Sequence, residues 1–358
     1  MRGFPTHPNE VTPDWLNDTL ARSHTAELGK VASVTWMPIG TGQVGDSVRF
    51  TLTHDGGEVS TLAAKFAAED ETSRGTAQMM RLYEKEVRFY GEIAPHLSAR
   101  LPRTYACEVS EDGGEFILLF EDLGPSRGGN QIAGCTIEDA RAGIRQAAAI
   151  HASSWERGDI IGKDWLKTPE PVSAQIAAMY PHAQATFAER YAEVLEPEYM
   201  EICQDFAPHF ADWSIPSKPP QCLLHGDFRL DNMLFDIKDG REPIAILDWQ
   251  TVTVGNGMTD IGYFMGTGIG NELRRAHEGE MLDLYLSEMA ANGVVLTHEG
   301  IWQDYLIGSL SGIATGVFSA AFVERTERGD ANFLSMVRGA CTLAHEHGSL
   351  ETLEKAKT

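Results

Sequence analysis

Basic residues are scarce in this sequence. Lys and Arg together number 29 against 52 Asp and Glu, so the formal net charge is −23. A protein that binds nucleic acid needs a basic face for the phosphate backbone, so this balance argues against nucleic acid as a partner. The charge is compatible with a cationic substrate, although an acidic surface that favours solubility explains it more simply.

Cysteine is also scarce, with five residues in a chain of 358. The number is odd and no two cysteines have CxxC spacing, which disfavours both a disulfide framework and a zinc site. The first fifteen residues, MRGFPTHPNEVTPDW, contain no apolar segment of the kind found in signal peptides. We therefore expect reduced thiols and a cytoplasmic location.

Long apolar runs are nearly absent, and the one exception is YLIGSLSGIATGVFSAAFV, residues 305–323. Gly308, Gly312 and Gly316 are spaced by four, as in helices that approach a neighbour closely. Four Ser and Thr residues dilute the apolar character, and no second such segment exists. The pattern favours a buried, tightly packed helix over a membrane span.

The order of predicted elements indicates two parts. Thr12 and Pro13 begin a helix that Gly29 ends. Strands are predicted at 31–39, 46–54, 60–67, 105–110 and 115–123, with a helical stretch at roughly 74–98. Residues 124–130, GPSRGGN, resemble a linker, and the pattern beyond them is mostly helical. We predict an α+β fold with a β-rich front lobe, 1–121, an α-rich back lobe, 122–358, and a cleft between them.

Polar residues are concentrated in HGDFRLDNMLFD, residues 225–236, just before a predicted hairpin. Its strands are MLFD and PIAILDW, and its turn contains Asp239-Gly240. Asn232 precedes the first strand and Asp248 follows the second, so an antiparallel hairpin brings both to one end. Amide and carboxylate oxygens suit Mg²⁺.

Two further residues of this loop suit phosphate chemistry. Asp227 can orient a hydroxyl and accept its proton. Arg229 is a permanent cation that can reach a phosphate. His225 is expected to pack the loop rather than to act as a base.

The spacing His-Gly-Asp-x-x-x-x-Asn, followed by an Asp after a hairpin, resembles the aminoglycoside phosphotransferase and choline kinase group of the protein-kinase-like fold. The segment QTVTVGNGMTDIGYFMG (250–266) resembles a poorly characterised bacterial branch of that group. The resemblance implies a bilobal kinase that uses ATP and Mg²⁺. Asp227 matches its catalytic aspartate, Arg229 matches a nearby basic residue, and Asn232 and Asp248 match its metal ligands.

The front part contains matching features. GTGQVG, with Gly40, Gly42 and Gly45, lies between two predicted strands and fits a phosphate-covering loop better than a dinucleotide site. Lys65 lies in an apolar strand and needs a charged partner. Glu86 matches the family pattern, and Glu84 is the local competitor.

Other segments match the family less specifically. The stretch FILLFEDLG resembles the interlobe hinge, whose backbone near Glu121 and Leu123 meets adenine. His151 is expected to be a core histidine. Asp260 is expected to cap a helix, and the resemblance implies that it also supports the catalytic loop.

Sequence features of protein kinases that this chain lacks indicate which class of substrate it uses. The glycine of DFG is absent after Asp248, and only eleven residues separate Asp248 from Asp260, too few for an activation loop. We therefore expect a kinase that phosphorylates a hydroxyl of a small molecule. Two alternatives remain open: a nucleotide-binding pseudokinase with a regulatory role, and a metal-dependent hydrolase that uses His225 and the aspartates.

Overall fold

The computed structural model describes residues 3–23, 29–40, 45–215, 218–323 and 325–356. It consists of two compact units, of which the first contains residues 1–96, 100–126 and 236–251 and the second contains 97–99, 127–235 and 252–358. The first unit holds the large sheet and the second holds most helices, which confirms the α+β class. The division differs from a single break after residue 121, because residues 236–251 pack with the first unit.

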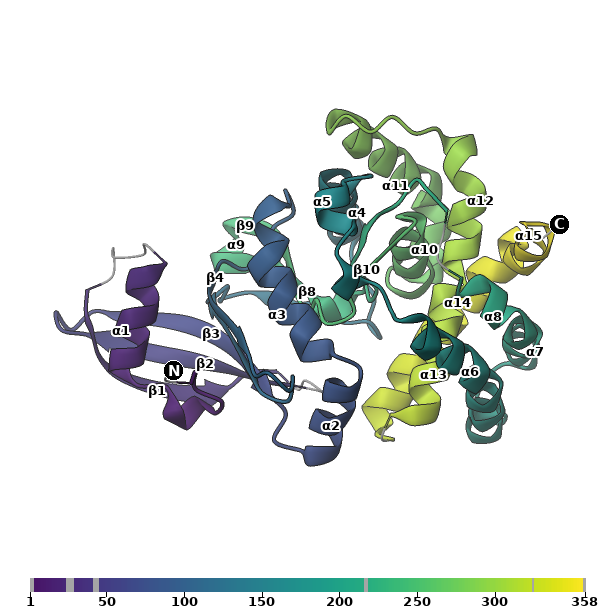
Figure 1. Ribbon diagram of the computed structural model, residues 1–358. Helices are drawn as coiled ribbons and strands as arrows, with labels where there is room; N and C mark the ends of the chain where they lie inside the picture. Colours follow the sequence, from purple (N-terminus) through teal and green to yellow (C-terminus); the bar gives the residue numbers. More distant parts are fainter. Residues whose placement is uncertain (1–2, 24–28, 41–44, 216–217, 324, 357–358) are drawn as a thin grey trace. The chain divides into compact units, whose positions relative to one another are not determined.

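An antiparallel five-stranded sheet forms the centre of the first unit, in the order β1-β2-β3-β5-β4. The helix α1 packs with the apolar face that includes Leu62 and Phe66, and Tyr83 of α3 stacks on Phe116 at 4.4 Å between ring centroids. Figure 1 shows both helices beside the sheet. The elements are α1 (Pro13–Arg22), β1 (Val31–Pro38), β2 (Gly45–His54), β3 (Val59–Ala67), α2 (Glu71–Met79), α3 (Leu82–Glu92), β4 (Thr104–Val109), β5 (Phe116–Glu121), α9 (Ile237–Gly240) and β9 (Glu242–Ile246).

The predicted strands of this unit are confirmed to within about two residues, because glycine and polar turns separate them clearly in the sequence. The predicted helical stretch at roughly 74–98 is helical, but it is divided into α2 and α3. Arg81 between them has a φ of 57°, which a continuous helix does not allow. Thr12 caps α1 as predicted, but α1 ends at Arg22.

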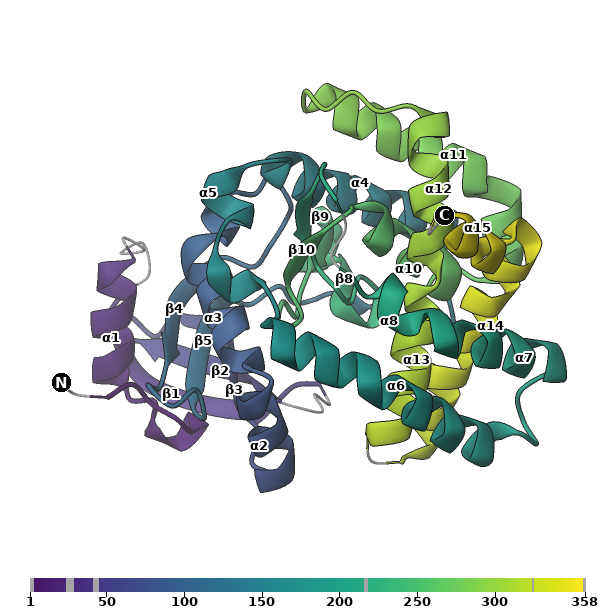
Figure 2. The same cartoon turned by 45° about the vertical axis from the view of Figure 1, so that its right-hand side comes forward.

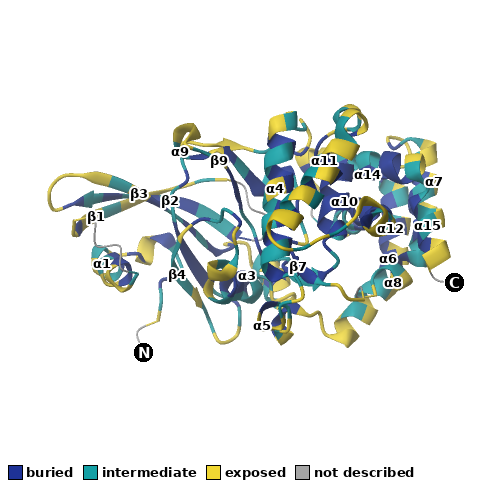
Figure 3. Cartoon of the chain, turned by 90° about the horizontal axis from the view of Figure 1, so that it is seen from above, coloured by how far each residue is buried: buried dark blue, intermediate teal, exposed yellow. Residues whose placement is uncertain are grey.

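Helices dominate the second unit, where α6, α7, α13 and α14 share one apolar core. Figure 2 shows α6 beside α13, and Figure 3 shows that α10 and α14 carry buried residues. The elements are β6 (Arg127–Gly128), α4 (Ile137–Ser154), α5 (Gly158–Ile161), α6 (Glu170–Tyr191), α7 (Pro197–Phe206), α8 (Phe210–Trp213), β7 (Cys222–Leu224), β8 (Met233–Asp236), β10 (Thr253–Gly255), α10 (Met258–Thr267), α11 (Asn271–Ala291), α12 (His298–Ser309), α13 (Ser311–Phe322), α14 (Glu327–His347) and α15 (Ser349–Ala356).

The glycine-spaced apolar stretch is packed as predicted, but it forms two helices, α12 and α13, that meet at Leu310. A Cβ on Gly308 would lie 2.3 Å from the Met258 carbonyl oxygen, and one on Gly312 would lie 2.7 Å from the Cβ of Ala340. Taken together, residues 298–322 are long and apolar enough to cross a membrane, and 67% of their most apolar window is buried in the protein.

Candidate functional site

Lys65 lies at the centre of an ion-pair cluster in the first unit. Its Nζ is 2.7 Å from Glu86 Oε2 and 2.9 Å from Asp248 Oδ1. The strand β3 directs Lys65 away from the α1 face and toward α3, because neighbouring side chains in a strand alternate. Glu84, the competing partner, pairs with Arg81 and Arg88 instead. The structure therefore joins Lys65 to the preferred glutamate and also to the predicted metal ligand.

Burial and charge act in opposite directions on this cluster. Burial favours the neutral form of Lys65, but the carboxylates of Asp248 and Glu86 outweigh it and raise the pKa of the lysine. Burial also raises the pKa of Glu86, whose side chain is 2% exposed, while Lys65 opposes that rise. Lys65 thus stays a cation and shares its charge between two acids.

The backbone at Asp248, the second acid that contacts Lys65, has an unusual conformation. Asp248 has a φ of 63°, a left-handed value that is uncommon for a residue with a side chain. The next residue, Trp249, is fully buried and stacks on Phe89 with ring centroids 3.9 Å apart. This ring contact fixes the residue that directly follows Asp248.

The structure describes only the two ends of the predicted glycine loop, residues 40 and 45. Gly40 has a φ of 81°, and a Cβ on Gly45 would lie 3.2 Å from Lys65 Cε. Gly42 lies outside the described residues. A Cβ at position 45 would also lie 3.1 Å from the Phe66 carbonyl oxygen, so the backbone at this end of the loop lies close to Lys65.

The hinge candidates are tied to their surroundings by backbone bonds. The Glu121 amide donates to the Arg103 carbonyl, and the Leu123 carbonyl accepts from the Lys238 amide, both at 2.9 Å. The Glu121 amide and the Leu123 carbonyl are therefore already engaged within the protein. The Glu121 side chain pairs with Arg100 and Lys238, an interaction that the sequence did not reveal because its members are far apart in the chain.

Asp227 is the most heavily hydrogen-bonded acid in the loop of the second unit. Its Oδ2 accepts from Arg229 Nε and Asn232 Nδ2, each at 2.9 Å. Its Oδ1 accepts from the Tyr263 hydroxyl at 2.7 Å. Burial would raise the pKa of Asp227, but Arg229 and Tyr263 outweigh it and lower the pKa, so the carboxylate is the favoured form.

Arg229 was predicted as a cation for phosphate, and the structure places it between two carboxylates. Its Nε contacts Asp227, and its Nη1 lies 3.2 Å from Asp231 Oδ2. Burial would lower the pKa of Arg229, but these acids raise it. In this arrangement Arg229 neutralises and orients the loop acids.

Asn232 has an orientation that fits metal binding. Its Nδ2 donates both to the Asp227 carbonyl oxygen at 2.8 Å and to Asp227 Oδ2. The amide nitrogen is thereby committed to Asp227, which leaves the amide oxygen as the group for a hard cation. Among the described residues, no group of three His, Cys, Asp or Glu side chains could hold a metal, so a site built on Asn232 and Asp248 needs phosphate or water oxygens as well.

Asp260 supports the loop from α10. Its carboxylate accepts from the His225 amide at 2.7 Å and the Gly226 amide at 3.1 Å, which confirms the predicted supporting role. The predicted helix cap is wrong, because α10 begins after Gly257 and Asp260 lies in its first turn. His151 is fully buried and contacts Asp260 and the Tyr285 hydroxyl, as expected of a core histidine.

His225 does not present a free ring to the loop. Its Nδ1 accepts from the Asp227 amide at 3.3 Å, and its ring packs edge-on against Phe228. This placement agrees with a structural role and gives no support to a hydrolase that would use His225.

The predicted residues thus form two groups, one in each unit. Asp248 belongs to the first and Asn232 to the second, so their convergence at one metal stays a prediction. Ile237 and Glu242 form an antiparallel bridge across the predicted turn. Tyr263 is the residue that sequence reasoning missed. It lies 36 positions after Asp227, and no local pattern connects the two.

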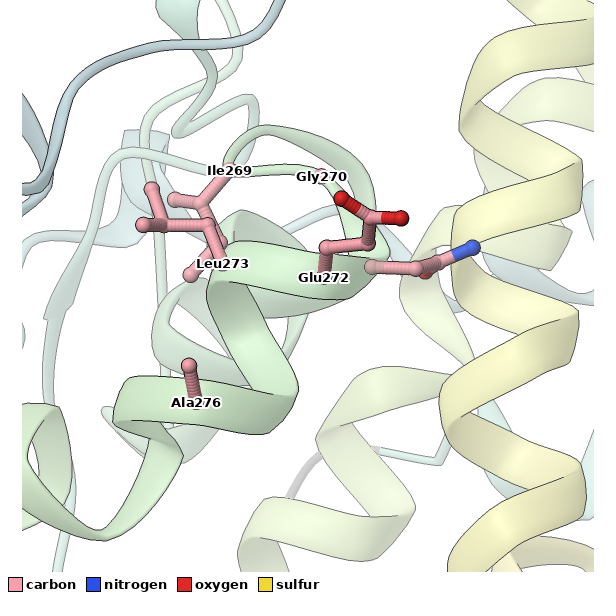
Figure 4. A pocket seen from close by; sticks show the side chains of 6 residues that line it. Ile269, Gly270, Glu272, Leu273 and Ala276 are labelled. Carbon is pink, nitrogen blue, oxygen red and sulfur yellow. The ribbon is translucent and has the colours of Figure 1, made fainter.

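The two described pockets contain none of the predicted site residues. One is lined by residues 269–273 and Ala276 at the start of α11, and Figure 4 shows Glu272 and Leu273 at its wall. The other, of about 540 Å³, lies between residues 131–135, 266–271 and α14.

Comparison with known proteins agrees with this assignment of the fold. A family model described as the ecdysteroid kinase-like family matches residues 47–297, which is more than two thirds of the chain. Acyl-CoA dehydrogenase family member 11 of Homo sapiens is 31% identical over 87 residues, 22% of this chain and 11% of that protein. Its counterpart in Rattus norvegicus is 34% identical over 113 residues, 28% of this chain and 14% of that protein. The chain thus matches only a small part of these relatives.

Among solved structures, a GDP complex of aminoglycoside 2'-phosphotransferase-IIIa has a TM-score of 0.52 at 12% identity. The match covers 91% of this chain and 97% of that chain. The chain therefore has the protein-kinase-like fold of aminoglycoside phosphotransferases.

Proposed function

The chain belongs to the ecdysteroid kinase-like family, and we propose that it is a kinase that uses ATP and Mg²⁺ to phosphorylate a hydroxyl group of a small molecule. The observation that carries this proposal is the pairing of Lys65 on β3 with Glu86 on α3. Kinases of this fold use a strand lysine, held by a helix glutamate, to bind nucleotide phosphates.

We assign the acceptor side to the loop of the second unit. Asp227 accepts a hydrogen bond from the acceptor hydroxyl and takes its proton as the phosphoryl group transfers and ADP leaves. Arg229 keeps Asp227 ionised, and Asp260 holds the loop backbone through the amides of His225 and Gly226.

The nucleotide side is assigned to Lys65, Gly45 and the hinge. Asn232 and Asp248 would provide oxygens for Mg²⁺, which would offset phosphate charge. Because Lys65 bonds to Asp248 in this structure, nucleotide binding requires the lysine to share or release that acid.

The acceptor is tested by a panel of hydroxyl compounds, scored by acceptor-dependent ADP release. The panel contains an ecdysteroid and a related sterol, because of the family description. It also contains aminoglycosides and a hydroxyacyl thioester, because of the phosphotransferase structure and the acyl-CoA dehydrogenase relatives. Neutral sugars complete it. We expect one chemical class to be phosphorylated. If none of the compounds causes ADP release, the proposal is contradicted.

Lys65→Ala tests the nucleotide side, and Lys167→Ala is its matched control. We expect Lys65→Ala to lose productive ATP use with its fold retained, since Lys65 serves phosphates. Lys167→Ala removes an exposed lysine that lies 4.0 Å from Asp164, and it should behave as wild type. Normal ATP kinetics in a folded Lys65→Ala protein would remove Lys65 from the site.

A nucleotide-binding regulatory protein is the second candidate. Two hydrogen bonds favour this candidate, because they occupy the proposed base and the proposed metal ligand. Asp227 accepts a hydrogen bond from Tyr263, and Asp248 accepts one from Lys65. Thermal melts with ATP, with and without Mg²⁺, separate the two candidates. Stabilisation by MgATP, without transfer to any acceptor, would favour the regulatory protein.

A further inference from the structure

The carboxylate of Asp227 has few hydrogen-bonding positions left. An ionised carboxylate offers about four lone-pair positions, two on each oxygen. Arg229 and Asn232 donate to Oδ2, and Tyr263 donates to Oδ1. Among the described residues these donors occupy three positions, so the remaining one lies on Oδ1, beside the Tyr263 hydroxyl.

The Tyr263 hydroxyl is suited to remain a donor. Burial and the charge of Asp227 raise its pKa well above the ordinary range, so the phenol keeps its proton.

The position of Tyr263 is fixed by the packing of α10. A Cβ on Gly262, the preceding residue, would lie 2.5 Å from the Ser309 amide nitrogen. Three residues after Tyr263, the Gly266 carbonyl oxygen lies 2.2 Å from where a Cβ on Gly339 would be. Backbone contacts on both sides thus prevent α10 from moving its tyrosine away from Asp227.

We propose that Tyr263 is a positioning residue, which holds Oδ1 of Asp227 so that the acceptor hydroxyl binds at the single remaining lone pair beside the phenol. This inference rests on the proposed function for its kinetic consequence. Its structural part, that Tyr263 fixes the orientation of the carboxylate, is independent of catalysis.

The structural part is tested in the ligand-free chain of 358 residues by NMR of the Arg229 Nε–H group, assigned through its loss in Arg229→Lys. This group donates to the same carboxylate, so a freer carboxylate changes its environment. We expect the resonance to shift or broaden in Tyr263→Phe. Tyr191→Phe is the matched control, because the Tyr191 hydroxyl donates to Asp330 Oδ1 at 2.6 Å and not to a residue of the loop. This variant should leave the Arg229 resonance unchanged.

An unchanged Arg229 resonance in Tyr263→Phe would overturn the proposal, whether or not the protein is a kinase. If Tyr263→Phe does not fold, Tyr263→Met removes the same hydroxyl with a flexible apolar side chain and must move the same resonance. A resonance that is unmoved in Tyr263→Met would then overturn the proposal.

The kinetic part is measured with the acceptor found in the panel. We expect Tyr263→Phe to lower kcat about 10-fold while the KM for MgATP stays within about 2-fold, because the phenol acts on the base and not on the nucleotide. Tyr191→Phe should keep the wild-type kcat. A wild-type kcat in Tyr263→Phe would overturn the positioning role even if the proposed kinase activity is established. A wild-type protein that phosphorylates nothing refutes the proposed function, and the NMR result then decides the orientation of Asp227 by itself.

Discussion

Asp227 and Asp248 are both carboxylates that contact a cationic side chain, yet their surroundings differ. Asp227 is one-fifth exposed and receives three side-chain donors, whereas Asp248 is one-third exposed and contacts Lys65. A carboxylate with many protein donors is suited to hold a hydroxyl in one direction. One with an open side is better suited to bind a metal.

We expect Asp227→Asn to retain MgATP binding and to lose turnover by about 10²–10⁴-fold, the usual effect of losing a positioned base. At about 1.4 kcal/mol per tenfold, this loss corresponds to ~3–5 kcal/mol of barrier. Titration of MgATP and turnover on the identified acceptor measure the two effects.

Asp248→Asn should show the opposite pattern, with weaker Mg²⁺-dependent nucleotide binding, because the substitution removes a ligand charge. Each variant is thus the control for the other. Wild-type turnover by Asp227→Asn would refute the catalytic assignment, and Mg²⁺-dependent binding that is intact in Asp248→Asn would refute the metal assignment.

Glu242 gives a prediction for pH. The hydrogen bond from Arg100 is the main reason that the pKa of Glu242 falls to about 2. A lowered pKa in the folded state means that the interaction stabilises the protein above the unfolded pKa and is lost as the pH falls toward 2.

We therefore expect Glu242→Gln to be less stable than wild type near neutral pH, with a difference that shrinks between about pH 4.5 and pH 2. Chemical unfolding at several pH values measures it. A stability difference that stays constant across this range would show that the ion pair does not contribute.

At the scale of elements, glycines allow α10 and α12 to meet at backbone distance. A Cβ at position 308 would lie 2.3 Å from a backbone oxygen of Met258, and a backbone atom cannot rotate away as a side chain can. The close approach of these helices is what places α10, and with it Asp260 and Tyr263, under the loop of Asp227.

We expect Gly308→Ala to lower the free energy of unfolding by about 1–3 kcal/mol, as overpacking in a core does. Gly279→Ala is the control. It lies within α11 and an added Cβ meets nothing within 4 Å, so alanine should be neutral or stabilising by up to about 1 kcal/mol. Equal stability of the two variants would contradict the close contact.

At the scale of the whole molecule, the apolar stretch 298–322 raises the question of membrane binding. Most of its apolar window is buried within the protein, and burial leaves little surface for lipid. We expect the native protein not to pellet with membranes. Pelleting that resists high salt would contradict this expectation.

The sequence determined much of the site by local pattern. The spacing from Asp227 to Asn232, the apolar strand around Lys65 and the turn at Asp239-Gly240 are properties of short segments. Strand boundaries were predictable for the same reason, since glycine and polar turns interrupt β-branched runs. The break between α2 and α3 was not predictable, because Arg81 adopts a left-handed conformation and arginine has no particular preference for it.

Only the tertiary structure decided which distant groups meet. It gave Lys65 a second acid, Asp248, 183 positions away. It placed Arg229 between two carboxylates and brought Tyr263 to Asp227. These contacts depend on helix packing, where glycines set the approach of α10, and no periodicity in a single segment encodes the distance between two helices.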